Sequence, residues 1–378
     1  VGAVGEGHKQ RGILAIGLLA LALCACDSVQ SALPQALRRA TETPSVTATL
    51  TASATATVTA TGTSTATPSA TATATATPSA TVTSTATATP SATLTSTATA
   101  SPTPSATATD TLEPLRLLLS LESYSVRQGH TLAIGVQASQ PVSLTGFLDG
   151  QLLCFAETGQ GGWALVGFGP WAEPGPRLLQ IGGLDRHGQQ ARLSAAVRVE
   201  PAAFGTDYLT IAPSLSRLLD PEVRQAEAVR LQQVFTVWTP QRLWEGPFIL
   251  PVQSVVTSPY GQSRSYNRQP VGNFHAGVDL RGTTGTLVHA ANRGKVALAE
   301  HLEVHGNVVV LDHGWGVYTL YAHLSVILVQ AGETVEAGQV IARVGSTGLV
   351  TGPHLHWEVR VSGVPVNPLE WIQRSFPQ

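Results

Sequence analysis

Histidine is concentrated in the last quarter of the chain, where eight of the 11 histidines lie between His275 and His356. Three short segments there read Phe-His-Ala-Gly-Val-Asp (274–279), Tyr-Ala-His (321–323) and Gly-Pro-His-Leu-His-Trp (352–357). Together they supply four histidines and one aspartate. Histidine is the commonest metal ligand and the side chain best suited to proton transfer near neutral pH. The set therefore predicts a metal-dependent hydrolytic site in which some side chains bind the ion and others handle protons.

The spacing of His354 and His356 predicts that both imidazoles reach one site. The segment 354–361, His-Leu-His-Trp-Glu-Val-Arg-Val, reads as a β-strand. Side chains two residues apart on a strand point to the same face. Leu355 and Trp357 are then expected to point the other way, into a core.

His275 and Asp279 are four residues apart, which is same-face spacing in both a helix and a strand. In an extended strand their Cα atoms would lie about 13 Å apart, too far for two bonds of about 2.0–2.2 Å to one zinc ion. The chain must tighten between them, and Gly277 permits this. Glycines at 277 and 282 also disfavour a helix.

Two histidines and one carboxylate around zinc leave a fourth position open for water. The ion makes that water more acidic and polarises the carbonyl under attack.

Residues from about 250 to 372 resemble the lysostaphin/LytM-type zinc endopeptidases, which cleave peptide bonds in bacterial peptidoglycan. The segments that carry the resemblance, in family order, are Ser258-Pro-Tyr-Gly261, His275-Ala-Gly-Val-Asp279, Gly285-Thr-Leu-Val288, Gly294-Lys-Val296, Gly306-Asn-Val308, Asp312-His-Gly314, Tyr321-Ala-His-Leu324, Val335-Glu-Ala-Gly-Gln339, Gly345-Ser-Thr-Gly348 and Gly352-Pro-His-Leu-His356.

By that resemblance, His275, Asp279 and His356 would bind one Zn²⁺ per catalytic domain. His323 and His354 would be the catalytic pair that does not bind the ion. One of the pair would act as general base and the other would stabilise the tetrahedral oxyanion, and either assignment fits the sequence. The implied substrate is a peptide of peptidoglycan.

The other histidines in this part of the chain are interpreted as non-catalytic. His313 lies in an Asp-His-Gly motif that the family often carries, so it is expected to be structural or to lie behind the ligands. His289, His301 and His305 are expected in loops or on the surface, away from the metal. Arg264 matches an arginine common after the family's opening Tyr-Gly turn, and it would contact substrate or form a surface salt bridge.

Two other functions compete with an active endopeptidase. A catalytically inactive relative would bind and activate another wall hydrolase, but such relatives generally lose zinc or catalytic positions, and this chain keeps all five. A different metalloenzyme with a His-x-His pair, such as an amidohydrolase, would leave the other motifs unexplained. There is no His-Glu-x-x-His of a zincin and no Gly-x-Ser-x-Gly of a serine hydrolase.

The first 25 residues are predicted to be a signal peptide. Lys9 and Arg11 precede an apolar run over residues 12–25, which is short for a membrane span and typical of a signal core. Leu23-Cys-Ala-Cys26 resembles a bacterial lipobox, so Cys26 is expected to carry a lipid that anchors the protein to the outer face of the cytoplasmic membrane. A cleaved signal without lipid, or an uncleaved anchor, is the alternative. Each leaves the body of the protein exported.

Residues 26–113 are predicted to be a disordered stalk. Between Thr43 and Thr109 there is no charged residue, and Thr, Ala, Ser and Pro make up nearly the whole segment. Such a composition buries too little apolar surface to offset the entropy cost of ordering. As a random coil these 67 residues would span about 45 Å, which would hold a folded head away from a membrane.

Residues 114–200 are predicted to form an Ig-like β-sandwich. Apolar and polar residues alternate in segments 131–136 and 191–199, and glycine and proline turns separate the apolar runs. No residue cluster in this domain suggests chemistry, so we interpret it as a spacer or a ligand-binding module.

Residues 201–249 are interpreted as a helical connector that leads to the zinc endopeptidase domain at 250–378. Asp220 as N-cap and Pro221 at the first helical position predict a helix that ends near Phe235. The expected fold class is mainly β, with an antiparallel β-sheet in the catalytic domain. The chain has 22 basic and 24 acidic side chains and no basic cluster, which argues against nucleic-acid binding.

Overall fold

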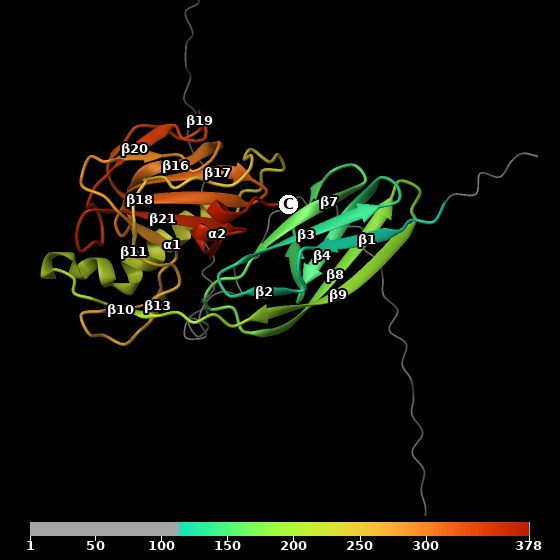
Figure 1. Ribbon diagram of the computed structural model, residues 1–378, viewed down its shortest axis with the longest axis horizontal. Coiled ribbons are helices and arrows are strands. Elements are labelled where there is room, and N and C mark those ends of the chain that lie inside the picture. Colours follow the sequence, from blue (N-terminus) through green and yellow to red (C-terminus); the bar gives the residue numbers. More distant parts are fainter. Residues whose placement is uncertain (1–112, 378) are drawn as a thin grey trace, which may run out of the picture. The chain divides into compact units, whose positions relative to one another are not determined.

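The computed structural model describes residues 113–377 of the chain (Figure 1). The predicted signal peptide (1–25), the predicted lipidation site Cys26 and almost all of the predicted stalk (26–113) lie outside the described residues. Between residues 113 and 377 the regular structure is mainly β-strand, which confirms the predicted fold class. No helix in this range is long and apolar enough to cross a membrane.

Two β-sheets make up the first part of the described chain. One contains, in spatial order, β1 (Leu117–Leu121), β3 (Thr131–Ala138), β7 (Gly161–Gly167) and β6 (Ala156–Glu157). The other contains β2 (Ser125–Arg127), β9 (Gln190–Glu200), β8 (Gly175–Asp185), β4 (Val142–Leu148) and β5 (Gln151–Leu153). All neighbouring strands are antiparallel except β2 and β9, which run parallel.

The inner faces of these two sheets share one hydrophobic core. Ile134 and Val136 of β3 pack in the same cluster as Leu179 and Ile181 of β8. In β8 these buried residues alternate with exposed ones, because successive side chains of a strand point to opposite faces. The alternation in the sequence thus produces the two-layer arrangement of a β-sandwich.

The segment after the sandwich contains more than a helix. It consists of strand β10 (Thr206–Leu209), the 3₁₀ helix η3 (Pro213–Leu219) and helix α1 (Pro221–Phe235). Helix α1 confirms the predicted helix, with Asp220 at the N-cap position, although the Asp220 side chain makes no capping hydrogen bond. Strand β10 is an addition to the predicted helical connector, and it pairs in parallel with β12 (Ser263–Tyr266).

The C-terminal domain is built on a ten-stranded antiparallel sheet. Its main path, in spatial order, is β11 (Val256–Ser258), β14 (Val278–Arg281), β21 (His354–Val361), β18 (Val317–Ile327), β17 (Gly306–Gly314), β16 (Gly294–Leu302) and β19 (Thr334–Val335). The strands β15 (Leu287–His289), β20 (Val340–Val344) and β22 (Val364–Val366) extend it at the sides, β13 (Asn273–Phe274) pairs with β12, and helix α2 (Pro368–Gln373) follows.

Strand β21 lies in the middle of this sheet, between β14 and β18. Its Leu355 and Trp357 are fully buried in the hydrophobic core, as predicted from their alternation with the histidines. The core also contains Trp244, which packs edge to face against Trp315 and Trp371 at ring-centroid distances of 5.5 and 5.9 Å. The packed core on one side of β21 leaves the histidine-bearing side for chemistry.

Candidate metal centre and catalytic site

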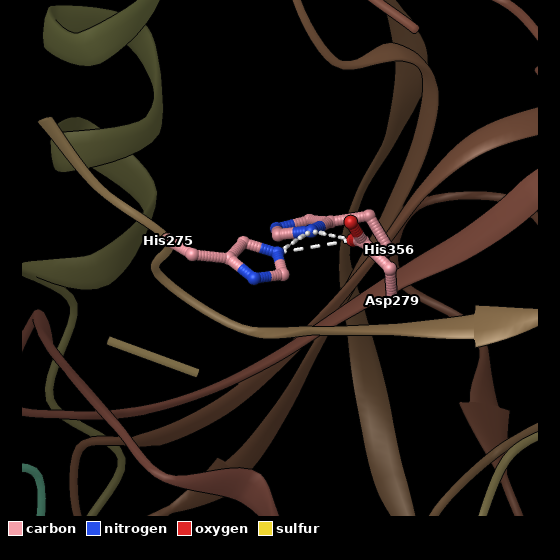
Figure 2. Close-up of side chains that lie close together, drawn as sticks. All are labelled: His275, Asp279 and His356. Carbon is pink, nitrogen blue, oxygen red and sulfur yellow. Dashed lines mark hydrogen bonds and ion pairs between the residues drawn. The ribbon is translucent and has the colours of Figure 1, made fainter. Parts of the chain in front are cut away.

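The three predicted ligands, His275, Asp279 and His356, converge on one point (Figure 2). His275 Nε2 lies 3.0 Å from Asp279 Oδ1 and 3.0 Å from His356 Nδ1, and His356 Nδ1 lies 2.9 Å from Asp279 Oδ1. Tetrahedral bonds of about 2.0–2.1 Å to zinc would separate the ligand atoms by about 3.3 Å. The three side chains are therefore close to the spacing that one zinc ion requires.

Strand register and one glycine bring these residues together. In the β14–β21 pair, Asp279 lies directly opposite His356. His275 precedes β14, and the chain between it and the strand passes close over β21. A Cβ atom at Gly277 would lie 2.2 Å from the carbonyl oxygen of Trp357, so only glycine fits at this crossing. The predicted tightening at Gly277 is confirmed.

Two of the ligands are held from outside by hydrogen bonds. His275 Nδ1 lies 2.9 Å from the carbonyl oxygen of Pro259, to which it donates, so its Nε2 lone pair faces the other ligands. Asp279 Oδ2 accepts a hydrogen bond of 2.9 Å from Arg264 Nη2, which leaves Oδ1 facing inward. Arg264 therefore forms a salt bridge, but with the buried carboxylate of Asp279 and not on the surface as predicted.

His356 is held in the same way by a residue that the sequence analysis did not single out. Its Nε2 lies 3.0 Å from Glu358 Oε1. When Nε2 donates this hydrogen bond, Nδ1 presents its lone pair to His275 and Asp279. Three acceptor atoms then face one another without a proton to share, an arrangement that suits a bound cation. Strand periodicity from His356 would have placed Glu358 on the same face.

The pKa values of the three side chains determine how readily they bind a metal ion. Burial raises the pKa of Asp279, but the adjacent imidazoles of His275 and His356 outweigh it and hold this pKa well below its usual range. Burial lowers the pKa of His275. Burial also disfavours charge on His356, but the adjacent carboxylates of Asp279 and Glu358 raise its pKa above the usual value, so a metal ion would compete with a proton at Nδ1.

The predicted catalytic pair, His323 and His354, lies beside the three converging side chains and outside that cluster. Their ring centroids are 5.0 Å apart, and the His323 ring is 5.9 Å from the ring of His356. His354 Nε2 is 3.6 Å from Asp279 Oδ1. Both imidazoles thus border the position where a fourth metal ligand and a substrate would lie.

Backbone carbonyls orient both of these rings. His323 Nδ1 donates to the carbonyl oxygen of Thr347 at 2.9 Å, and His354 Nδ1 donates to that of Gly352 at 2.8 Å. Each Nε2 is therefore free to accept a proton. Burial lowers the pKa of both residues, that of His323 well below its usual range, so both are neutral bases at pH 7.

His323 also has an unusual backbone conformation, with φ of 62°. This left-handed region is uncommon for residues other than glycine, and such strain collects at functional sites. The backbone N–H of His323 donates to the carbonyl oxygen of His305 at 2.9 Å, which holds the bend in place.

The other histidines follow the predictions only in part. His313 is fully buried and structural, with hydrogen bonds to the Arg293 carbonyl and to Thr319, and burial lowers its pKa to about 4. His301 is exposed, as predicted. His305 lies in a turn, as predicted, but the expectation that it is remote from the site is wrong: its ring centroid is 6.0 Å from that of His356.

Two cavities open onto the site. One, of about 370 Å³, is lined by Asp279, His323 and His354 together with Asp207 and Leu209 of strand β10. The other, of about 180 Å³, is lined by His275, His356 and three arginines, which are Arg224, Arg264 and Arg360. The connector therefore supplies part of the wall on both sides of the candidate metal centre.

The segment that holds this site is similar to known peptidases. Residues 273–368 match Peptidase family M23. Over 121 residues, which are 31% of this chain and 27% of the relative, the chain is 42% identical to the DD-carboxypeptidase/endopeptidase Mpg of Neisseria meningitidis. Over 96 residues, 25% of this chain and 22% of the relative, it is 45% identical to the peptidoglycan DD-endopeptidase ShyA of Vibrio cholerae.

A third relative is an activator of hydrolases and not itself named as a peptidase. The murein hydrolase activator EnvC of Escherichia coli is 43% identical over 98 residues, 26% of this chain and 23% of the relative. The matched segment spans only about a quarter of each relative's own length.

Proposed function

We propose that this protein is a zinc-dependent endopeptidase acting on peptide bonds in peptidoglycan stems or cross-links, because residues 273–368 match Peptidase family M23 and are similar to peptidoglycan endopeptidases. One observation carries the proposal. Three acceptor atoms, from His275, Asp279 and His356, meet at 2.9–3.0 Å, while the imidazoles of His323 and His354 stand beside them with Nε2 free.

His275, Asp279 and His356 would hold the zinc ion. When bound, zinc supplies a water of lowered pKa and polarises the scissile carbonyl. His323 or His354 would accept a proton from the attacking water at Nε2, because each ring already donates its Nδ1 proton to a backbone carbonyl. The other imidazole would stabilise the oxyanion on the carbonyl oxygen by donating from Nε2 only when that nitrogen also carries a proton, because its Nδ1 proton is already donated to a backbone carbonyl. The proton taken up at Nε2 can then pass to the leaving amine.

The burial of the site histidines supports the roles proposed for them. His323 and His356 are buried, and the half-buried His354 borders the larger cavity. A dry, fixed environment makes hydrogen bonds to developing charge stronger than they would be in water. The groove lined by β10 and by residues 349–354 would hold an extended peptide against the two imidazoles.

A non-hydrolytic activator of another wall hydrolase is the second candidate, because EnvC is among the relatives. Against it stands the set of five side chains, which this chain keeps in positions suited to catalysis. The activity of the purified protein separates the two candidates.

We further propose that the protein is exported and anchored through a lipid on Cys26, with residues 26–113 as a stalk and the β-sandwich as an Ig-like spacer. The support is the sequence of the signal-like segment, the lipobox-like Leu23-Cys-Ala-Cys26 and the uncharged Thr/Ala/Ser/Pro tract.

A zymogram on purified peptidoglycan tests the proposal. Clearing by the wild type, its loss with chelator and its return with added zinc are expected, and mass analysis of the released fragments would name the bond. Absence of clearing, combined with stimulation of another wall hydrolase, would favour the activator instead.

A further inference from the structure

A row of charged side chains continues outward from the metal-site residue His356. Its first member is Glu358, two residues further along β21, whose Oε1 lies 3.0 Å from His356 Nε2. A carboxylate that accepts from the outer nitrogen of a ligating histidine fixes the ring and increases the basicity of the inner nitrogen. Glu358 thus sets which nitrogen of His356 faces the metal.

Glu358 can remain charged only if other groups compensate it, because its side chain is 1% exposed. Arg360 Nε donates to Oε2 at 2.6 Å, and His305 Nε2 lies 3.8 Å from Oε1. An uncompensated buried carboxylate would be costly and would take up a proton. His305 and Arg360 therefore keep Glu358 in the state that orients His356.

His305 is in turn held by Glu227 of helix α1. The Glu227 carboxylate accepts from His305 Nδ1, from the His305 backbone N–H at 3.1 Å and from the Val304 N–H at 2.6 Å. Its side chain is 5% exposed. The Glu227 carboxylate thus fixes both the turn that carries His305 and the His305 imidazole. All of these hydrogen bonds of Glu227 are made to that turn.

Helix α1 (Pro221–Phe235) lies outside residues 273–368, the segment that matches the peptidase family. We propose that Glu227 is a positioning residue of the metal centre, acting through His305 and Glu358 on His356, so that α1 completes the centre from outside the matched domain. The inference rests on the proposed metal site and deepens it.

A second metal site is the competing interpretation, since His305, His356 and Glu358 also lie close enough to bind an ion. His356 would then bridge two ions, one at each ring nitrogen. The positioning role instead uses its Nε2 as a donor and predicts one zinc ion per chain.

The test is the zinc affinity of the full chain, measured by competition with a chromogenic chelator. Glu227→Gln should weaken zinc binding about 10- to 100-fold. The control is Glu222→Gln, an exposed residue in the first turn of α1, which should leave the affinity unchanged. Because zinc binding is measured without substrate, a wild type that binds zinc and cleaves nothing would refute the proposed function and leave this inference standing.

A double-mutant cycle shows whether Glu227 acts through His305. His305→Gln should cost about as much zinc affinity as Glu227→Gln, and the double variant little more than either. The absorption spectrum of the cobalt(II)-substituted protein should change in the same three variants and not in Glu222→Gln. Wild-type affinity in Glu227→Gln, additive losses in the double variant, or two zinc ions per wild-type chain would each overturn the proposal.

Discussion

Substitution of Gly277 by alanine tests how the fold brings the metal ligands together. The added Cβ would lie 2.2 Å from the carbonyl oxygen of Trp357, whereas an ordinary carbon–oxygen contact is about 3.4 Å. The chain between His275 and Asp279 must therefore move about 1 Å away from the strand that carries His356. Metal sites tolerate deviations of only about 0.2 Å in ligand distances.

Gly277→Ala should therefore weaken zinc binding at least about 100-fold. Strain in the packed region should also lower stability by about 1–3 kcal/mol. Zinc affinity is measured by chelator competition, and stability by thermal unfolding in excess chelator. The matched control is Gly272→Ala, where the nearest atom to a new Cβ is 3.9 Å away and neither quantity should change. Wild-type zinc affinity in Gly277→Ala would refute the reasoning.

Three further predictions follow. Arg264→Ala removes the hydrogen bond to Asp279 Oδ2 and should weaken zinc binding about 10-fold in chelator competition. His313→Ala removes two buried hydrogen bonds and leaves a cavity, so it should cost about 2–4 kcal/mol in thermal unfolding and leave zinc stoichiometry at one. Burial opposes charge on His305, but Glu227 and Glu358 raise the pKa of His305 from 6.5 to about 9. This shift corresponds to a contribution of about 3 kcal/mol to the stability of the folded state. That contribution is complete below pH 6.5 and is lost as pH rises through about 9. When stability is measured by thermal unfolding in excess chelator, the loss of stability caused by His305→Gln should therefore become smaller as the pH rises from 6.5 to about 9.

The sequence was sufficient for the candidate site where spacing along one strand or one loop decides the geometry. His354 and His356 share a strand face by periodicity alone, and the distance that an extended chain would put between His275 and Asp279 pointed to Gly277, although the structure requires glycine there because the chain passes close to the Trp357 carbonyl oxygen. The start of helix α1 was likewise readable from Asp220 and Pro221.

Contacts between distant segments were not readable from spacing. His305 and Glu227 are 78 residues apart, and no local pattern relates a turn histidine to a buried glutamate on a preceding helix. The expectation that His305 lies away from the metal site was wrong for that reason. Strand β10 was not predicted because only four of its residues pair with β12. Its parallel pairing depends on how the connector packs against the C-terminal domain, which local sequence does not indicate.

The proposed mechanism depends most on the division between three metal ligands and two histidines that do not bind the metal. Zinc content by metal analysis, together with turnover on peptidoglycan, should be compared for purified His275→Ala and His323→Ala. The account predicts no bound zinc in His275→Ala. It predicts one zinc ion per chain in His323→Ala, with most turnover lost. Equal zinc content in the two variants would contradict it.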